Sequence, residues 1–158
     1  MSKKLVAYFS AGGVTASLAK ELAKKAEADL YEIRPRVKYT EEDLNWRNLK
    51  SRSSVEMNDR SIRPEAVTGD LDVSGYDVVF LGFPIWWYVA PTIVNTFLEA
   101  YDFSGKKIVL FATSGGSGFG NTLLELQPSA PNSKMKESLV IFGGYEEEDL
   151  MKILAAQY

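Results

Sequence analysis

The segment from Ser10 to Ser17 has the composition of an anion-binding turn. It follows a short apolar run, and hydroxyl residues flank its adjacent glycines, Gly12 and Gly13. Adjacent glycines let the backbone turn tightly and bring amides close to a ligand, and the N-terminus of a following helix adds partial positive charge. Such a turn can hold phosphate without Lys or Arg, and we favour this interpretation over an ordinary strand–helix turn. The spacing matches neither the glycine–lysine loop of nucleoside triphosphatases nor the dinucleotide fingerprint.

A second segment, Phe83–Pro91, places three large aromatic residues side by side, Trp86, Trp87 and Tyr88. Neighbouring side chains of an extended chain point to opposite faces, so at least one of the three is expected to face a ligand crevice at the end of the strand. A flat aromatic surface suits stacking on a flat heteroaromatic ring. We favour this role over the alternative, core aromatics beside a proline-bounded turn.

A third segment, Thr113–Asn121, is rich in glycine. Ordering so many glycines next to a buried strand costs chain entropy. We therefore favour a loop whose backbone amides reach the polar edge of a bound ring over a flexible connector.

Composition limits the chemistry that these segments can perform. The chain has no His, no Cys and a formal net charge of -3. The two missing residue types exclude disulfides, thiolate nucleophiles, Cys-ligated iron–sulfur clusters, the usual zinc sites and every Ser-His-Asp arrangement. Redox chemistry would need a bound cofactor. The mild negative charge argues against a nucleic-acid partner.

Length and hydropathy predict one globular domain, 1–158. The 158 residues are 46% hydrophobic and 25% charged, which is typical of a folded domain and not of a disordered chain. No apolar run is long enough for a membrane span. Because Met1–Lys4 leads into a strand-like run without a cleavage signal, we expect a cytoplasmic protein.

Apolar runs and helical stripes predict an α/β fold with three layers. Asp29–Ile33 alternates polar and apolar residues like an edge strand, and four unbroken runs predict buried strands: Leu5–Phe9, Asp77–Gly82, Ile108–Ala112 and Leu139–Phe142. The predicted helices are Val14–Ala26, Pro91–Ala100, Gly118–Leu126 and Glu146–Ala156. This alternation predicts a doubly wound five-stranded parallel sheet of order 2-1-3-4-5. The three segments then meet at the carboxyl edge of the sheet, where ligands of such folds bind.

Residues 34–72 are the irregular part of the chain, being charged and poor in large apolar residues. Thr40 followed by acidic residues predicts a helix from Glu41 to about Arg52, with a loop after it. The arginines of this stretch could meet a pyridine-nucleotide phosphate, but we favour a solvated, charged crossover. Trp46 could wall a bound ring, form a dimer contact or cover the sheet.

Taken together, the three segments resemble the flavin mononucleotide (FMN) loops of the flavodoxin-like family: Tyr8–Thr15, Pro84–Trp87 and Thr113–Gly120. The resemblance covers nearly the whole chain and implies a flavodoxin-like fold with non-covalently bound FMN. It implies phosphate contacts from Ser10, Gly12, Gly13, Val14 and Thr15. It implies ring contacts from Pro84, Ile85, Trp86, Trp87 and Tyr88, and contacts to the polar ring edge from Thr113, Ser114, Gly115, Gly116, Gly118 and Phe119.

The chain also departs from the family pattern. Gly12 stands where many members have a hydroxyl residue, Val14 where many have Asn, and Tyr88 where many have Gly. The third segment lacks the Tyr that stacks on the ring in many electron-carrier flavodoxins, which implies one open ring face.

The resemblance leaves more than one function open. It implies an electron carrier that passes electrons through FMN to and from a redox partner protein. The alternative is an FMN-dependent NAD(P)H:quinone-type oxidoreductase, because an open ring face would let nicotinamide and then quinone stack in turn. A third possibility is a flavin-free binding or scaffold module.

Overall fold

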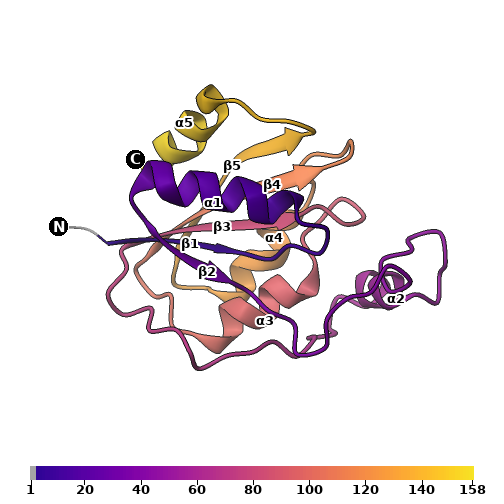
Figure 1. Ribbon diagram of the computed structural model, residues 1–158. Coiled ribbons are helices and arrows are strands. Elements are labelled where there is room, and N and C mark those ends of the chain that lie inside the picture. Colours follow the sequence, from indigo (N-terminus) through magenta and orange to yellow (C-terminus); the bar gives the residue numbers. More distant parts are fainter. Residues whose placement is uncertain (1–2) are drawn as a thin grey trace.

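The computed structural model describes residues 3–158 as a parallel sheet with helices on both faces (Figure 1). The five strands are paired in the order β2-β1-β3-β4-β5, and every pair is parallel. Their bounds are β1 (Lys4–Tyr8), β2 (Asp29–Glu32), β3 (Val78–Pro84), β4 (Lys107–Ser114) and β5 (Lys134–Phe142). The predicted fold class and strand order are confirmed.

The sheet is buried on both faces because alternate residues of its central strands pack into different clusters. Leu5 and Ala7 of β1 join one core, and Val6 and Tyr8 join the other. The second core is covered by α1 (Val14–Ala26) and α5 (Glu147–Ala155), and the first by α3 (Thr92–Ala100) and the short α4 (Thr122–Leu126), which runs into the turn η1 (Gln127–Ser129). Within residues 3–158, no helix is both long and apolar enough to cross a membrane.

The two edge strands differ. Strand β2 is exposed at one edge, as its alternating pattern predicts. Strand β5 is longer than predicted and begins with the polar stretch 134–138, which is partly exposed. In the predicted run, Leu139–Phe142, the last residue is 56% exposed, so the prediction of full burial is wrong for β5. Its edge position leaves it one neighbouring strand, and its pairing shifts register between Leu110 and Phe111.

The predicted helix from Glu41 to Arg52 is wrong, although its start signal forms. The Asp43 amide donates to Thr40 Oγ1 at 3.1 Å, and the Thr40 amide donates to Asp43 Oδ2 at 2.9 Å. The residues that follow form turns, in which Asn45 and Asn48 accept hydrogen bonds from amides two residues further on. Such local side-chain bonds compete with the helical pattern, and the stretch has no apolar stripe to offset them.

The crossover helix, α2 (Arg52–Asn58), begins where the predicted helix would end. Ser51 caps it by accepting a hydrogen bond from the Ser54 amide at 3.3 Å. Helix α2 stands apart from the two helical layers, beyond the carboxyl ends of the strands (Figure 1). The crossover therefore adds a wall at the edge where the three predicted loops meet.

Candidate functional site

A groove of about 1230 Å³ lies at the carboxyl edge of the sheet. All three predicted loops contribute to it, together with the crossover and the end of β5. The predicted site residues that line it are Ser10, Gly12, Val14, Thr15, Pro84, Ile85, Trp86, Trp87, Tyr88, Thr113, Ser114, Gly115 and Gly116. Gly13, Gly118 and Phe119 lie in the same loops but do not line the groove.

The groove is uncharged. Among residues 3–158, none of those that line it is Asp, Glu, Lys or Arg. An anionic group bound there would meet main-chain amides and hydroxyls alone. A large apolar share of the lining, including three aromatic residues of one loop, suits a flat ring.

One end of the groove is built on the N-terminus of α1. The helix begins at Val14, and its N-cap residue, Gly13, has no side chain that could cap it. The first amides of a helix have no intrahelical acceptor, so those of 14–16 are free to bind an anion beside the positive end of the helix dipole. The Gly13 amide itself donates to Ser10 Oγ at 3.0 Å and so closes the turn.

Thr15 joins this end of the groove to the third loop. Its side chain is 2% exposed, and its Oγ1 lies 2.8 Å from Oγ1 of Thr113. In such a contact one hydroxyl donates its proton to the other, and the accepting hydroxyl keeps its own proton for a further acceptor. The pair can therefore hold the first and third loops together and still donate a hydrogen bond to a bound anion.

The second loop ends in a tight turn of two aromatic residues. Trp86 and Val89 exchange backbone hydrogen bonds of 2.9 and 3.1 Å across it. Trp87 and Tyr88 then have φ angles of 48° and 70°, in the left-handed region that residues other than glycine rarely occupy. Strained backbone of this kind is concentrated at functional sites. The turn leaves both side chains exposed, Tyr88 to 70% and Trp87 to 37%.

Trp86 differs from its two neighbours because it belongs to the core as well as to the groove. Its indole meets the rings of Phe9 and Tyr39 edge to face, with ring centroids 5.8 and 5.5 Å away. The prediction that at least one of the three aromatics faces the crevice is met by all three.

The third loop is held by its own hydroxyl groups. Ser114 Oγ accepts hydrogen bonds from the amides of Gly116 and Ser117 at 3.2 and 2.9 Å. These two amides are turned into the loop, which differs from the expectation that they serve a ring edge. Phe119 packs against the core instead of the groove.

Gly120 connects the third loop to the second. Its φ is 54°, and a Cβ atom at this position would lie 2.3 Å from the carbonyl oxygen of Tyr88. The backbone of Gly120 thus packs directly against the strained turn of the second loop. The sequence alone does not assign Gly120 to the site, because this contact joins residues far apart in the chain.

The crossover supplies a wall of the groove that, apart from Trp46, the sequence does not indicate. Leu44, Trp46, Ser53 and Met57 line the groove from this side, and 141–143 at the end of β5 line it as well. Trp46 lies at the groove with 63% of its surface exposed. Of the three roles considered for Trp46, a wall of the binding site therefore agrees with its position.

The arginines of the crossover are engaged in structural contacts. Arg34 pairs with Asp70, Arg36 with Glu65, Arg52 with Glu56, Arg60 with Glu125 and Arg63 with Glu99. Arg47 lies over the ring of Trp46. In the described part of the chain, no arginine lines the groove. These ion pairs agree with the charged crossover that we favoured, although Arg52 and Arg60 are partly buried in it and not fully solvated.

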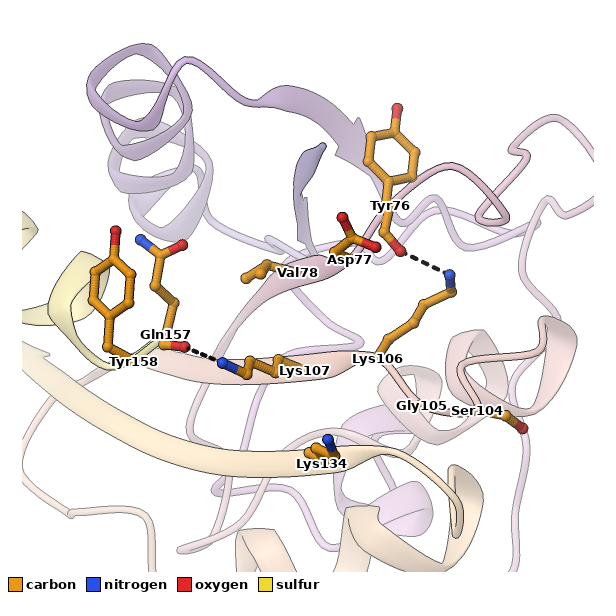
Figure 2. A pocket seen from close by; sticks show the side chains of 10 residues that line it. All are labelled: Tyr76, Asp77, Val78, Ser104, Gly105, Lys106, Lys107, Lys134, Gln157 and Tyr158. Carbon is orange, nitrogen blue, oxygen red and sulfur yellow. Dashed lines mark hydrogen bonds between the residues drawn. The ribbon is translucent and has the colours of Figure 1, made fainter. Parts of the chain in front are cut away.

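A smaller hollow of about 390 Å³ lies at the opposite edge of the sheet (Figure 2). Two of its three lysines have structural partners, since Lys106 Nζ donates to the Tyr76 carbonyl at 2.7 Å and Lys107 Nζ to the Gln157 carbonyl at 3.0 Å. The second bond ties β4 to the residues after α5. The groove is therefore the better candidate site.

Several solved structures are similar to this chain. A candidate flavoprotein from Bacteroides eggerthii is 45% identical, with a TM-score of 0.91 over 99% of this chain and 98% of that one. A second, from Bacteroides uniformis, is 44% identical, with a TM-score of 0.90 over 97% and 98%. A flavoprotein from Lactobacillus acidophilus, solved in complex with FMN, is 19% identical, with a TM-score of 0.70 over 89% and 93%. At 19% identity, this similarity shows that the two proteins share a fold.

No curated protein matches the sequence. The family model described as flavodoxin matches residues 3–156, nearly the full length of the chain. The match agrees with the strand order and with a groove formed by the loops after β1, β3 and β4. The chain belongs to the flavodoxin family.

Proposed function

We propose that the chain binds FMN without a covalent bond in the groove and works as an electron-transfer protein. The observation that carries this proposal is the combination, in one uncharged groove, of a helix N-terminus with free amides and a wall of aromatic side chains. FMN has a phosphate dianion at one end and a flat ring at the other. When bound, it supplies the electron chemistry for which the chain, with no Cys and no His, has no side chains.

The chain's own residues have separable roles in this proposal. The amides of 14–16 and the hydroxyl of Thr15 hold the phosphate. Trp86, Trp87 and Tyr88 contact the ring and exclude water from one side of it. The family membership and the FMN complex of the Lactobacillus acidophilus protein, which shares the fold, support FMN as the ligand.

Titration with FMN tests the proposal directly. We expect FMN to quench tryptophan fluorescence and to raise the melting temperature, because a ligand that binds only the folded state stabilises it by about 2.7 kcal/mol at 100 times its Kd. Adenosine monophosphate, which has a phosphate but no isoalloxazine ring, is the control. Unchanged fluorescence and melting temperature at millimolar FMN would rule out the proposal.

The pH dependence of binding gives a second prediction. A phosphate monoester loses its second proton at a pKa of about 6. Because the amides favour the dianion, FMN affinity should be constant above this pKa and fall as the pH drops through it, by up to about tenfold per pH unit. Riboflavin affinity should be flat between about pH 5 and 8, since the chain has no His and the described groove lining is uncharged. Calorimetry of both ligands checks this, and a matching fall for riboflavin contradicts it.

A cytoplasmic carrier served by a redox partner protein is the mode of action we propose. The position of Trp46 supports a second mode of action, that of an NAD(P)H:quinone-type oxidoreductase. This exposed aromatic side chain could hold a flat electron acceptor against the groove. Anaerobic NADPH distinguishes the two modes. Bleaching of the flavin spectrum without another protein supports the enzyme, and bleaching only with an added flavodoxin reductase supports the carrier.

A further inference from the structure

We propose that Tyr39, Glu56 and Arg52 form a positioning cluster that fixes the indole of Trp86 and thereby sets how tightly the groove holds a flavin ring. This inference rests on the proposed function, since it assigns the ring of FMN to the groove. None of the three cluster residues lines the groove itself. They act through Trp86.

Tyr39 contacts Trp86 directly. The two ring centroids are 5.5 Å apart with an interplanar angle of 77°, and Phe9 meets both rings edge to face. Tyr39 and Phe9 are buried, whereas Trp86 also lines the groove. The face that Trp86 turns to a ligand is therefore set by the packing behind it.

Glu56 and Arg52 hold the Tyr39 ring at its edge and at its face. The Tyr39 hydroxyl donates to Glu56 Oε1 at 2.5 Å, and Arg52 Nε donates to Glu56 Oε2 at 3.1 Å. The guanidinium carbon of Arg52 lies 3.8 Å from the centre of the Tyr39 ring. Its Nη1 donates to the carbonyl of Val37 at 2.7 Å. A ring fixed at its hydroxyl and covered by a cation cannot turn independently of α2.

The burial of this cluster indicates a role in orientation. Glu56 is only 6% exposed and its partner Arg52 is partly buried. A largely buried ion pair often stabilises a fold no more than apolar residues of the same size would. Burial, with the hydrogen bond to Glu56, raises the pKa of Tyr39 far above its ordinary value. The phenol therefore stays a hydrogen-bond donor, and the geometry of the ring is maintained.

A second contact ties the crossover to the far end of the same loop. Arg60 Nη2 donates to the carbonyl of Ala90 at 2.9 Å, and Arg60 also pairs with Glu125. The loop that bears Trp86 is thus attached to the crossover on both sides of its turn. This gives the long crossover between β2 and β3 a function: it supports the ring-binding loop.

Two substitutions test the cluster in the full chain. Tyr39→Phe removes the hydroxyl and keeps the ring, and Glu56→Gln removes the charge and keeps the shape. Arg36→Gln is the matched control, because its pair with Glu65 lies in the same crossover but is exposed. Fluorine NMR of protein labelled with fluorotryptophan reports on the three tryptophans separately, with each signal assigned by a Trp→Phe variant.

We expect the Trp86 signal to shift or broaden in both variants and to be unchanged in the control. FMN and riboflavin should both weaken, by the same factor of about threefold to tenfold, because the ring contact is common to them. An unmoved Trp86 signal with unchanged affinities, even with a lower melting temperature, would show a purely structural cluster and overturn the proposal. If Tyr39→Phe folds poorly, Glu56→Gln supplies the same comparison.

The two hypotheses fail in different ways. If the wild-type chain binds neither FMN nor riboflavin, the proposed function is wrong, and the fluorine signal of Trp86 alone decides whether the cluster positions it. If the wild type binds both flavins and the variants bind them equally well, the proposed function stands and the positioning role is wrong.

Discussion

Replacing Thr15 with Val is expected to weaken FMN binding by about 1–3 kcal/mol, which is the cost of leaving a charged acceptor without one donor. Thr15 is buried in the first turn of α1, and its hydroxyl contacts that of Thr113 at the groove. Valine has nearly the same shape, so the change removes a donor and little packing. Riboflavin, which has no phosphate, should bind almost as before.

Calorimetric titration of both flavins measures this selectivity. Ser17→Ala is the matched control, because it also removes a hydroxyl from the start of α1, at an exposed position that does not line the groove. Loss of the contact with Thr113 should lower stability slightly, by about 1 kcal/mol. Equal weakening of FMN and riboflavin would place the phosphate elsewhere.

The architecture could be predicted from the sequence because its signals are local and repeated. Unbroken runs such as Leu5–Phe9 and Ile108–Ala112 require cover on both faces, and the helical stripes between them supply it. The same logic failed at β5. Its polar first half is tolerated because an edge strand has only one neighbour, a property that the residues of the strand do not show.

The crossover shows that a local sequence signal alone does not determine where a helix forms. Thr40 and Asp43 form the predicted cap, but a cap contributes about 1 kcal/mol and cannot hold a helix that has no buried face. Helix α2 forms only from Arg52 onward, where Met57 and Glu56 become buried against the rest of the protein. That burial depends on tertiary contacts with segments far away in the chain.

The candidate site likewise has one part that local sequence signals predict and another that depends on tertiary contacts. The three loops could be found because glycines, hydroxyls and adjacent aromatics interrupt the apolar runs at the end of a strand. The groove residues Leu44 and Met57 belong to no such pattern, and only the folded crossover brings them to the groove. Trp86 was predicted as a ring contact, but its equal role in the core depends on Tyr39 and Phe9.

Replacing Gly120 with Ala is expected to weaken both FMN and riboflavin by at least about tenfold, or 1.4 kcal/mol. The new Cβ would lie 2.3 Å from the Tyr88 carbonyl oxygen, and neither partner is a flexible side chain that could move aside. Either the third loop or the strained turn at Trp87 and Tyr88 must shift. Both changes disturb the aromatic wall, whereas the amides at the start of α1 are untouched.

Gly105→Ala separates this effect from backbone strain. Gly105 has a φ of 76°, also in the left-handed region, but a Cβ there would meet nothing within 4 Å. Both variants should lose about 1 kcal/mol or more of stability in denaturant unfolding, since alanine is strained at such angles. Only Gly120→Ala should lose flavin affinity. If the two variants bind FMN equally well, the contact between Gly120 and Tyr88 does not support the ring-binding loop.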